Sequence, residues 1–185
     1  ILAFDIEVDK STEDFEKVNN VKIFRADIIY HLYDMFVEHL KQYKLERREA
    51  LKSETVFPCI MTILDCFHHK DPLIIGVRVD KGFLYPQQPI CLPTGRLLGK
   101  VESIQKDNKS HSTAKAGAEV AIRIETADSS TTYGRTFSKE DTPNLYTAMN
   151  RKSIDILKKY YRDDLTKEDW ACVKAIKTLL NIDSA

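Results

Sequence analysis

The residues best suited to bind a metal are two cysteines and two histidines in one short stretch. They are Cys59, Cys66, His68 and His69. Zinc is commonly held by cysteine and histidine, but its sites recur at regular short spacings that this stretch does not show. Both cysteines also lie in or beside a run that is typical of a β-strand. We therefore expect buried cysteines and a histidine pair in a loop, and no metal site.

The common motifs of catalysis are absent from the sequence. It contains neither G-x-x-x-x-G-K-[ST] nor G-x-G-x-x-G, the glycine patterns of nucleotide-binding loops, and no H-E-x-x-H of metalloproteases. Asp5, Glu7 and Asp9 alternate along the first nine residues, which favours a solvated strand edge over a metal site. We expect a chain that binds partners, has no catalytic residues and holds no cofactor.

Composition limits what those partners can be. The 28 lysines and arginines balance 28 aspartates and glutamates, so the formal net charge is zero. Because extensive phosphate binding needs an excess of cations, any contact with nucleic acid should be local. No apolar run is long enough to cross a bilayer, there is no signal-peptide pattern, and the four cysteines form no disulfide framework. We expect a cytoplasmic protein without a membrane partner, and a piece of a larger chain.

The N-terminal residues predict a strand, a short helix and a second strand. "ILAFDIEVD" (1–9) places Phe4, Ile6 and Val8 on one side, as in a half-buried strand. Ser11 is the expected cap of the helix, and "VKIF" (21–24) is the expected second strand. Such a unit normally belongs to a parallel sheet.

The next stretch, 27–52, predicts one long helix with two unlike halves. An apolar stripe follows the helical repeat as far as Tyr43, at Ile28, Leu32, Met35, Phe36, Leu40 and Tyr43. Beyond Tyr43 the residues are mixed charges and strong helix formers, with little to bury. We expect a stalk whose first half packs on the N-terminal unit and whose second half crosses water. The alternative is a surface helix that frays near Arg48.

The remaining residues predict a small closed antiparallel β-barrel followed by a helical hairpin. Six short strand-like runs are separated by turn signals, at 56–64, 73–80, 89–93, 97–105, 118–125 and 132–137. Two amphipathic helices follow, and Thr166 with Asp169 forms the capping pair of the second. The predicted fold class is therefore α+β: a partial α/β unit (1–25), a long connecting helix (26–54), and a barrel with two C-terminal helices (55–185).

Five strings occur in order along the chain: "IFRADIIYHLYDMF", "VFPC", "KDPLIIGVRVDKG", "YGRTF" and "SIDILKKYYRDDLTKEDW". Together they resemble the C-terminal part of eukaryotic translation initiation factor 5B, the homologue of bacterial initiation factor two. The resemblance implies the end of a third domain, a linker helix, and a fourth domain similar to domain 2 of elongation factors. It also implies that GTP and Mg²⁺ bind to a GTPase domain outside this sequence.

That family joins ribosomal subunits during initiation, and the resemblance implies that the barrel contacts the acceptor end of methionyl initiator tRNA on the ribosome. Such a site needs a few donors for sugar and phosphate, and an apolar recess for the methionyl group. The candidates are cations expected on outward strand positions or in turns: Arg78, Lys81, Lys100, Arg123 and Arg135. Each could equally be a solvated surface charge.

The resemblance also implies a protein partner for the C-terminal helices, the acidic, apolar-ended C-terminal tail of eukaryotic initiation factor 1A. Such a peptide needs an apolar groove flanked by cations. The candidates are Arg162, Trp170, Val173, Lys174, Ile176, Lys177 and Leu180. The apolar residues among these candidates could instead serve only to pack the helix on the barrel. The whole chain could also be a structural spacer of a translational GTPase without a ligand of its own. The segments 105–117 and 126–132 do not match the family pattern.

Overall fold

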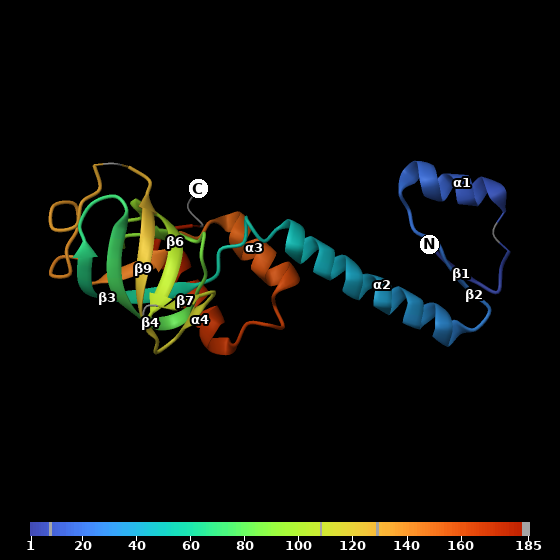
Figure 1. The fold of residues 1–185 in the computed structure, drawn as a ribbon. Coiled ribbons are helices and arrows are strands. Elements are labelled where there is room, and N and C mark those ends of the chain that lie inside the picture. The colour runs from blue at the N-terminus through green and yellow to red at the C-terminus, as the bar shows by residue number, and fades with distance from the viewer. Residues whose placement is uncertain (8, 108, 129, 183–185) are drawn as a thin grey trace. The chain divides into compact units, whose positions relative to one another are not determined.

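The computed structural model describes residues 1–7, 9–107, 109–128 and 130–182, apart from the side chains of Glu13 and Glu16. The chain divides into two compact units, Ile1–Ala50 and Leu51–Ala185. Figure 1 traces the elements of each unit in chain order.

The first unit contains the predicted strand, helix and strand. β1 (Leu2–Phe4) pairs in parallel with β2 (Phe24–Ala26), and α1 (Lys10–Asn19) lies between them in the sequence. The first strand is shorter than predicted because Asp5 has a φ of 49°, a left-handed conformation that cannot continue a strand. The predicted inward residue Ile6 is exposed, and Val8 lies outside the described residues.

The cap of α1 is Asp9 instead of the predicted Ser11. The Asp9 carboxylate accepts hydrogen bonds from the backbone N–H of Thr12 at 2.9 Å and from the Ser11 hydroxyl at 3.0 Å. Hydrogen bonds from the Thr12 side chain and backbone, and from Ser11, lower the pKa of Asp9 below its usual value. A carboxylate at this position satisfies a free N–H at the helix start, as an N-cap residue should.

α2 (Ile29–Ala50) is one continuous helix of 22 residues. Its contact with the sheet centres on Leu32, which is buried, and on Phe36 and His39, whose rings lie 5.8 Å and 5.1 Å from that of Phe24. The prediction that the whole stripe packs on the sheet is wrong. Ile28, Met35, Leu40 and Tyr43 are exposed, since two strands of three residues offer a surface about 10 Å long, which covers only about two turns of the helix.

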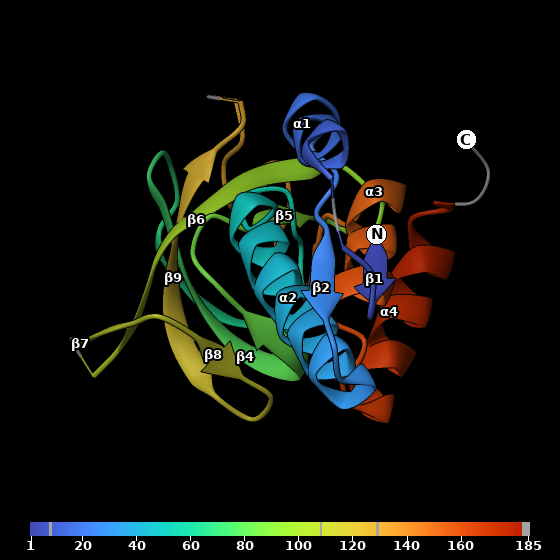
Figure 2. The ribbon, with the colours of Figure 1, turned by 90° about the vertical axis from the view of Figure 1, so that its right-hand side faces the viewer.

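The second unit is a closed antiparallel barrel. Its strands are β3 (Cys59–His68), β4 (Leu73–Leu84), β5 (Pro89–Cys91), β6 (Leu97–Lys106), β9 (Glu119–Thr126) and β10 (Asn144–Thr147). They follow the order β3–β10–β5–β6–β9–β4, and pairing between β4 and β3 closes the ring. Two short strands extend it, β7 (Lys109–His111) beside β6 and β8 (Ala114–Lys115) beside β4. The curvature of β6 and β9 is visible in Figure 2. The predicted fold class is confirmed.

The barrel interior is filled by the residues that the alternating pattern predicted. Ile75 and Val77 on β4 and Ile122 and Ile124 on β9 are completely buried. The prediction for the sixth strand is wrong. Thr132–Phe137 forms a loop with one isolated bridge between Tyr133 and Phe137. The sixth strand of the ring is instead β10, which pairs with both β3 and β5.

The C-terminal hairpin consists of α3 (Arg151–Tyr160) and α4 (Lys167–Leu179). Thr166 and Asp169 form the capping box that the sequence predicted. The apolar faces of both helices build a second core with residues from the outer surface of the barrel. The barrel side of this core includes Phe57, Ile60, Phe83 and Tyr146. In the part of the chain that the structure describes, no helix is long and apolar enough to cross a membrane.

Candidate functional site

Two of the five cations predicted to bind RNA are already paired with carboxylates. Arg78 Nε donates to Asp80 at 3.0 Å, and Arg123 Nε to Glu102 at 2.7 Å. Lys100 lies opposite Glu125 across the β6–β9 ladder. Lys81 lies opposite Ile60, a residue that packs against the hairpin core. Lys100 and Arg123 are therefore neighbours on the outer face of the β6–β9 ladder, each beside a carboxylate, whereas Arg78 and Lys81 lie on β4.

The fifth cation, Arg135, belongs to a cluster that the sequence did not reveal. It lines a surface pocket of about 610 Å³ with two further cations and three hydroxyl groups. The lining residues are Lys70, Arg96, Ser130, Thr132, Arg135 and Thr136. We call this the basic pocket. Within the described part of the chain, no ion pair joins any of its three cations to a carboxylate. The pKa of Asp128 is lowered mainly by hydrogen bonds from Ser130 and to a smaller extent by the charge of Arg96.

The strand directions explain why these residues meet. Lys70 lies in the β3–β4 turn, Arg96 in the β5–β6 turn, and Arg135 in the segment after β9. Because neighbouring strands run antiparallel, the end of β3, the start of β6 and the end of β9 all lie at the same end of the barrel. Lys70 and Arg96 stand next to turn signals in the sequence, so a search for cations in the turns at this end would have found them.

The loop that carries Arg135 is held beside the β3–β4 turn by defined contacts. Tyr133 N donates to the carbonyl of His69 at 3.0 Å, and the two rings lie 5.5 Å apart. Thr132 N donates to Thr136 Oγ1 at 3.1 Å, which closes the loop on itself. Two of the three lining hydroxyls already donate within the protein, that of Ser130 to Asp128 at 2.6 Å and that of Thr136 to the Ser130 carbonyl at 3.4 Å. The guanidinium and ammonium groups around this space are the donors suited to an anion such as a phosphate.

The residues predicted to bind a peptide differ in their accessibility. Val173 and Ile176 are buried in the second core, so they pack α4 against the barrel and are not accessible to a peptide. Trp170 and Leu180 are half-buried at the edge of that core, as is Lys177 on the same helix. The remaining two candidates, Arg162 and Lys174, are exposed.

A groove of about 510 Å³ runs along the outer side of α3 and matches the chemistry expected for an acidic peptide. It is lined by Arg151, Lys152, Asp155, Ile156, Lys159 and Tyr160. We call this the α3 groove. It has three cations and one carboxylate around Ile156 and Tyr160. Two of the cations form ion pairs, Arg151 with Asp155 at 3.4 Å and Lys152 with Glu54 at 2.8 Å.

Comparison with known proteins places the chain in a family. Residues 58–143 match the family model described as Elongation factor Tu domain 4. The chain is 37% identical to eukaryotic translation initiation factor 5B of Rattus norvegicus, over 98% of this chain and 15% of that protein. For the same factor of Saccharomyces cerevisiae the identity is 36%, over 99% of this chain and 20% of that protein. This chain is homologous to the C-terminal region of translation initiation factor 5B.

A solved structure agrees with this homology to initiation factor 5B. The crystal structure of GDP-bound aIF5B from Aeropyrum pernix matches with a TM-score of 0.63 and 29% identity, over 96% of this chain and 29% of that one. The resemblance predicted from the five strings is thereby confirmed. The chain spans 15% to 20% of the length of the rat and yeast factors.

Proposed function

We propose that this chain is the C-terminal fragment of a translation initiation factor GTPase that promotes the joining of ribosomal subunits in the cytoplasm. Homology to initiation factor 5B along 98% of the chain carries this proposal. Residues 1–25 would end the third domain, 26–54 would form the linker helix, and 55–185 would be the fourth domain. GTP and Mg²⁺ would bind in a separate domain, so the fragment would act by binding and not by catalysis.

Within this role, the barrel binds the acceptor end of methionyl initiator tRNA. The supporting observation is the basic pocket, where Lys70, Arg96 and Arg135 surround one space. Few cations are needed, because a single-stranded acceptor end presents only a few phosphates, and this agrees with a net charge of zero. Of the predicted RNA contacts, Arg135 is the residue best placed to take part.

An equilibrium titration tests this proposal. Labelled methionyl initiator tRNA should bind the chain with an affinity that falls as salt rises, and a duplex RNA without a free acceptor end should bind more weakly. Equal binding of both RNAs would contradict recognition of the acceptor end.

The C-terminal hairpin docks the acidic C-terminal tail of initiation factor 1A. The supporting observations are the cations around the α3 groove and the partly exposed side chains of Trp170 and Leu180 at the edge of the second core. Carboxylates of the tail would meet the cations while its apolar end covers Tyr160. Titration with a synthetic tail peptide, and with a peptide in which the acidic residues are replaced by amides, separates specific docking from weak hydrophobic association.

A second candidate function is that of a structural spacer without a ligand. The observation in its favour is α2, an unbroken helix of 22 residues whose buried residue is Leu32. The spacer function predicts that neither the tRNA nor the tail peptide binds.

A further inference from the structure

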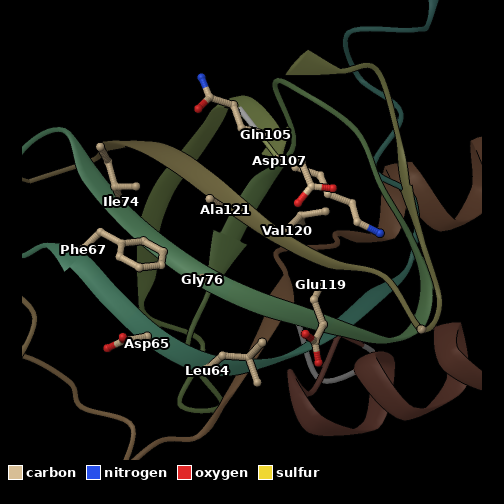
Figure 3. A pocket seen from close by; sticks show the side chains of 12 residues that line it. Leu64, Asp65, Phe67, Ile74, Gly76, Gln105, Asp107, Glu119, Val120 and Ala121 are labelled. Carbon is tan, nitrogen blue, oxygen red and sulfur yellow. The ribbon is translucent and has the colours of Figure 1, made fainter. Parts of the chain in front are cut away.

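The outer wall of the barrel carries a second hollow, which none of the proposed RNA or peptide contacts uses. It has a volume of about 740 Å³ and crosses β3, β4, β9 and the end of β6. Figure 3 shows Phe67 on one side of Gly76, with Glu119 and Asp107 on the other. We call this hollow the acidic groove.

The hollow exists because small residues meet in register. Gly76 on β4 lies opposite Asp65 on β3 and Ala121 on β9, and Ala121 lies opposite Gln105 on β6. At the two central positions of this row, Gly76 therefore has no side chain and Ala121 has a single methyl group. The row crosses four strands that lie about 4.8 Å apart, so it is roughly 14 Å long. A peptide of about four residues in an extended conformation has the same length.

One wall of the groove is an exposed aromatic ring. The Phe67 side chain is 63% exposed, more than any other large apolar residue described in the second unit. Its ring lies over Gly76, where an added Cβ would be 3.2 Å from the ring edge. Gly76 thus leaves room for the edge of the Phe67 ring, and most of that side chain stays open to solvent.

The groove has a local excess of negative charge. Three carboxylates, those of Asp65, Asp107 and Glu119, line it with one ammonium, that of Lys106. The difference is two negative charges in a chain whose formal net charge is zero. Arg78, which lies opposite Glu119 across the ladder, directs its guanidinium to Asp80 instead. Phosphates are repelled by such a lining, whereas cations are attracted.

We propose that the acidic groove binds a short basic peptide segment of a partner protein, with an arginine stacked on Phe67. A guanidinium can lie flat on an aromatic ring while its N–H groups bond to a neighbouring carboxylate, here Asp65. A second cation about four residues further along, on the same face of an extended peptide, reaches the carboxylates of Glu119 and Asp107. The alkyl stems of both side chains cover Gly76 and Ala121.

The proposal does not rest on the RNA or tail-peptide contacts proposed above. None of the residues that line the acidic groove is among the proposed RNA or peptide contacts.

Fluorescence polarisation with a labelled Arg-Gly-Ala-Gly-Arg peptide, whose two arginines share one face when extended, tests the proposal, with Glu-Gly-Ala-Gly-Glu as the charge-reversed probe. The arginine peptide should bind with an affinity that falls as salt rises, and the glutamate peptide should not bind. Phe67→Ala and the double variant Asp65→Asn/Glu119→Gln should each weaken binding at least about tenfold. Asp163→Asn, which removes an exposed carboxylate between α3 and α4, is the matched control and should leave binding unchanged.

Gly76→Ala adds a second test that leaves the charge unchanged. The new methyl group would lie against the Phe67 ring and fill part of the groove, so the affinity for the peptide should fall. The melting temperature and the affinity for tRNA should stay close to those of the parent chain. Equal peptide binding by Asp163→Asn and the groove variants would overturn the proposal. A single-stranded oligonucleotide that competes with the peptide at Phe67 would also overturn it.

Discussion

Replacing both Arg96 and Arg135 by glutamine should weaken tRNA binding about thirty-fold. Both side chains line the basic pocket and are exposed. A charge-assisted hydrogen bond contributes about 1.5–3 kcal/mol, and solvent screening at an exposed site reduces this to about 1 kcal/mol for each arginine. Two such contacts amount to about 2 kcal/mol, and about 1.4 kcal/mol corresponds to a tenfold change in Kd.

The same double variant should change the salt dependence. Each phosphate contact to a single strand contributes about 0.7 to the slope of log K against log salt, so losing two contacts lowers the slope by about 1.4. The assay is a polarisation titration with labelled methionyl initiator tRNA at several salt concentrations. Circular dichroism should show that the variant keeps its fold, because neither side chain belongs to a core.

The matched control is the double variant Lys109→Gln/Lys115→Gln. It removes two exposed cations from β7 and β8, which adjoin the end of β6 and the end of β4, at the opposite end of the barrel. The loss of net charge is the same, but Kd should change less than about threefold. If both double variants weaken binding equally, the contact is a diffuse attraction and the reasoning from the basic pocket is wrong.

Three further predictions concern the hairpin, the barrel and the thiols. Trp170→Ala should weaken tail-peptide binding by about 2 kcal/mol in a protein that still folds, and unchanged affinity in calorimetry would remove Trp170 from the docking surface. Leu145→Ala should lower the free energy of unfolding by about 2–5 kcal/mol in a denaturant titration, because Leu145 is completely buried on the sixth strand of the ring. Burial raises the pKa of Cys91 and of Cys172 to about 11 from an ordinary value of 9.0. Because the unfolded thiols ionise first, the free energy of unfolding should fall as pH rises from about 9 to about 11, and replacing both residues by alanine should remove that part of the pH dependence.

Local patterns predicted the elements whose structure depends on neighbouring residues. The capping box of Thr166 and Asp169 requires only two residues three positions apart, so it could be predicted directly from the sequence. The alternation of Ile75 and Val77 with polar residues likewise predicted an inward face, because side chains in a strand alternate with a period of two.

Features that depend on distant residues could not be predicted in this way. The strand Asn144–Thr147 has four residues, too few to show an alternation, and it is a strand because β3 and β5 lie on either side of it. Amphipathic periodicity also does not reveal what covers an apolar face. Val173 and Ile176 follow the helical repeat equally well as a peptide-binding surface or as a core, and in the structure they belong to a core. The basic pocket joins turns that are far apart in the sequence.

An amide chemical-shift map of the chain with methionyl initiator tRNA shows which residues the tRNA contacts. Binding at the basic pocket predicts that the largest changes occur around Lys70, Arg96 and the loop that carries Arg135, at one end of the barrel. Changes restricted to the acidic groove or to the opposite end of the barrel, or no changes at all, would contradict it.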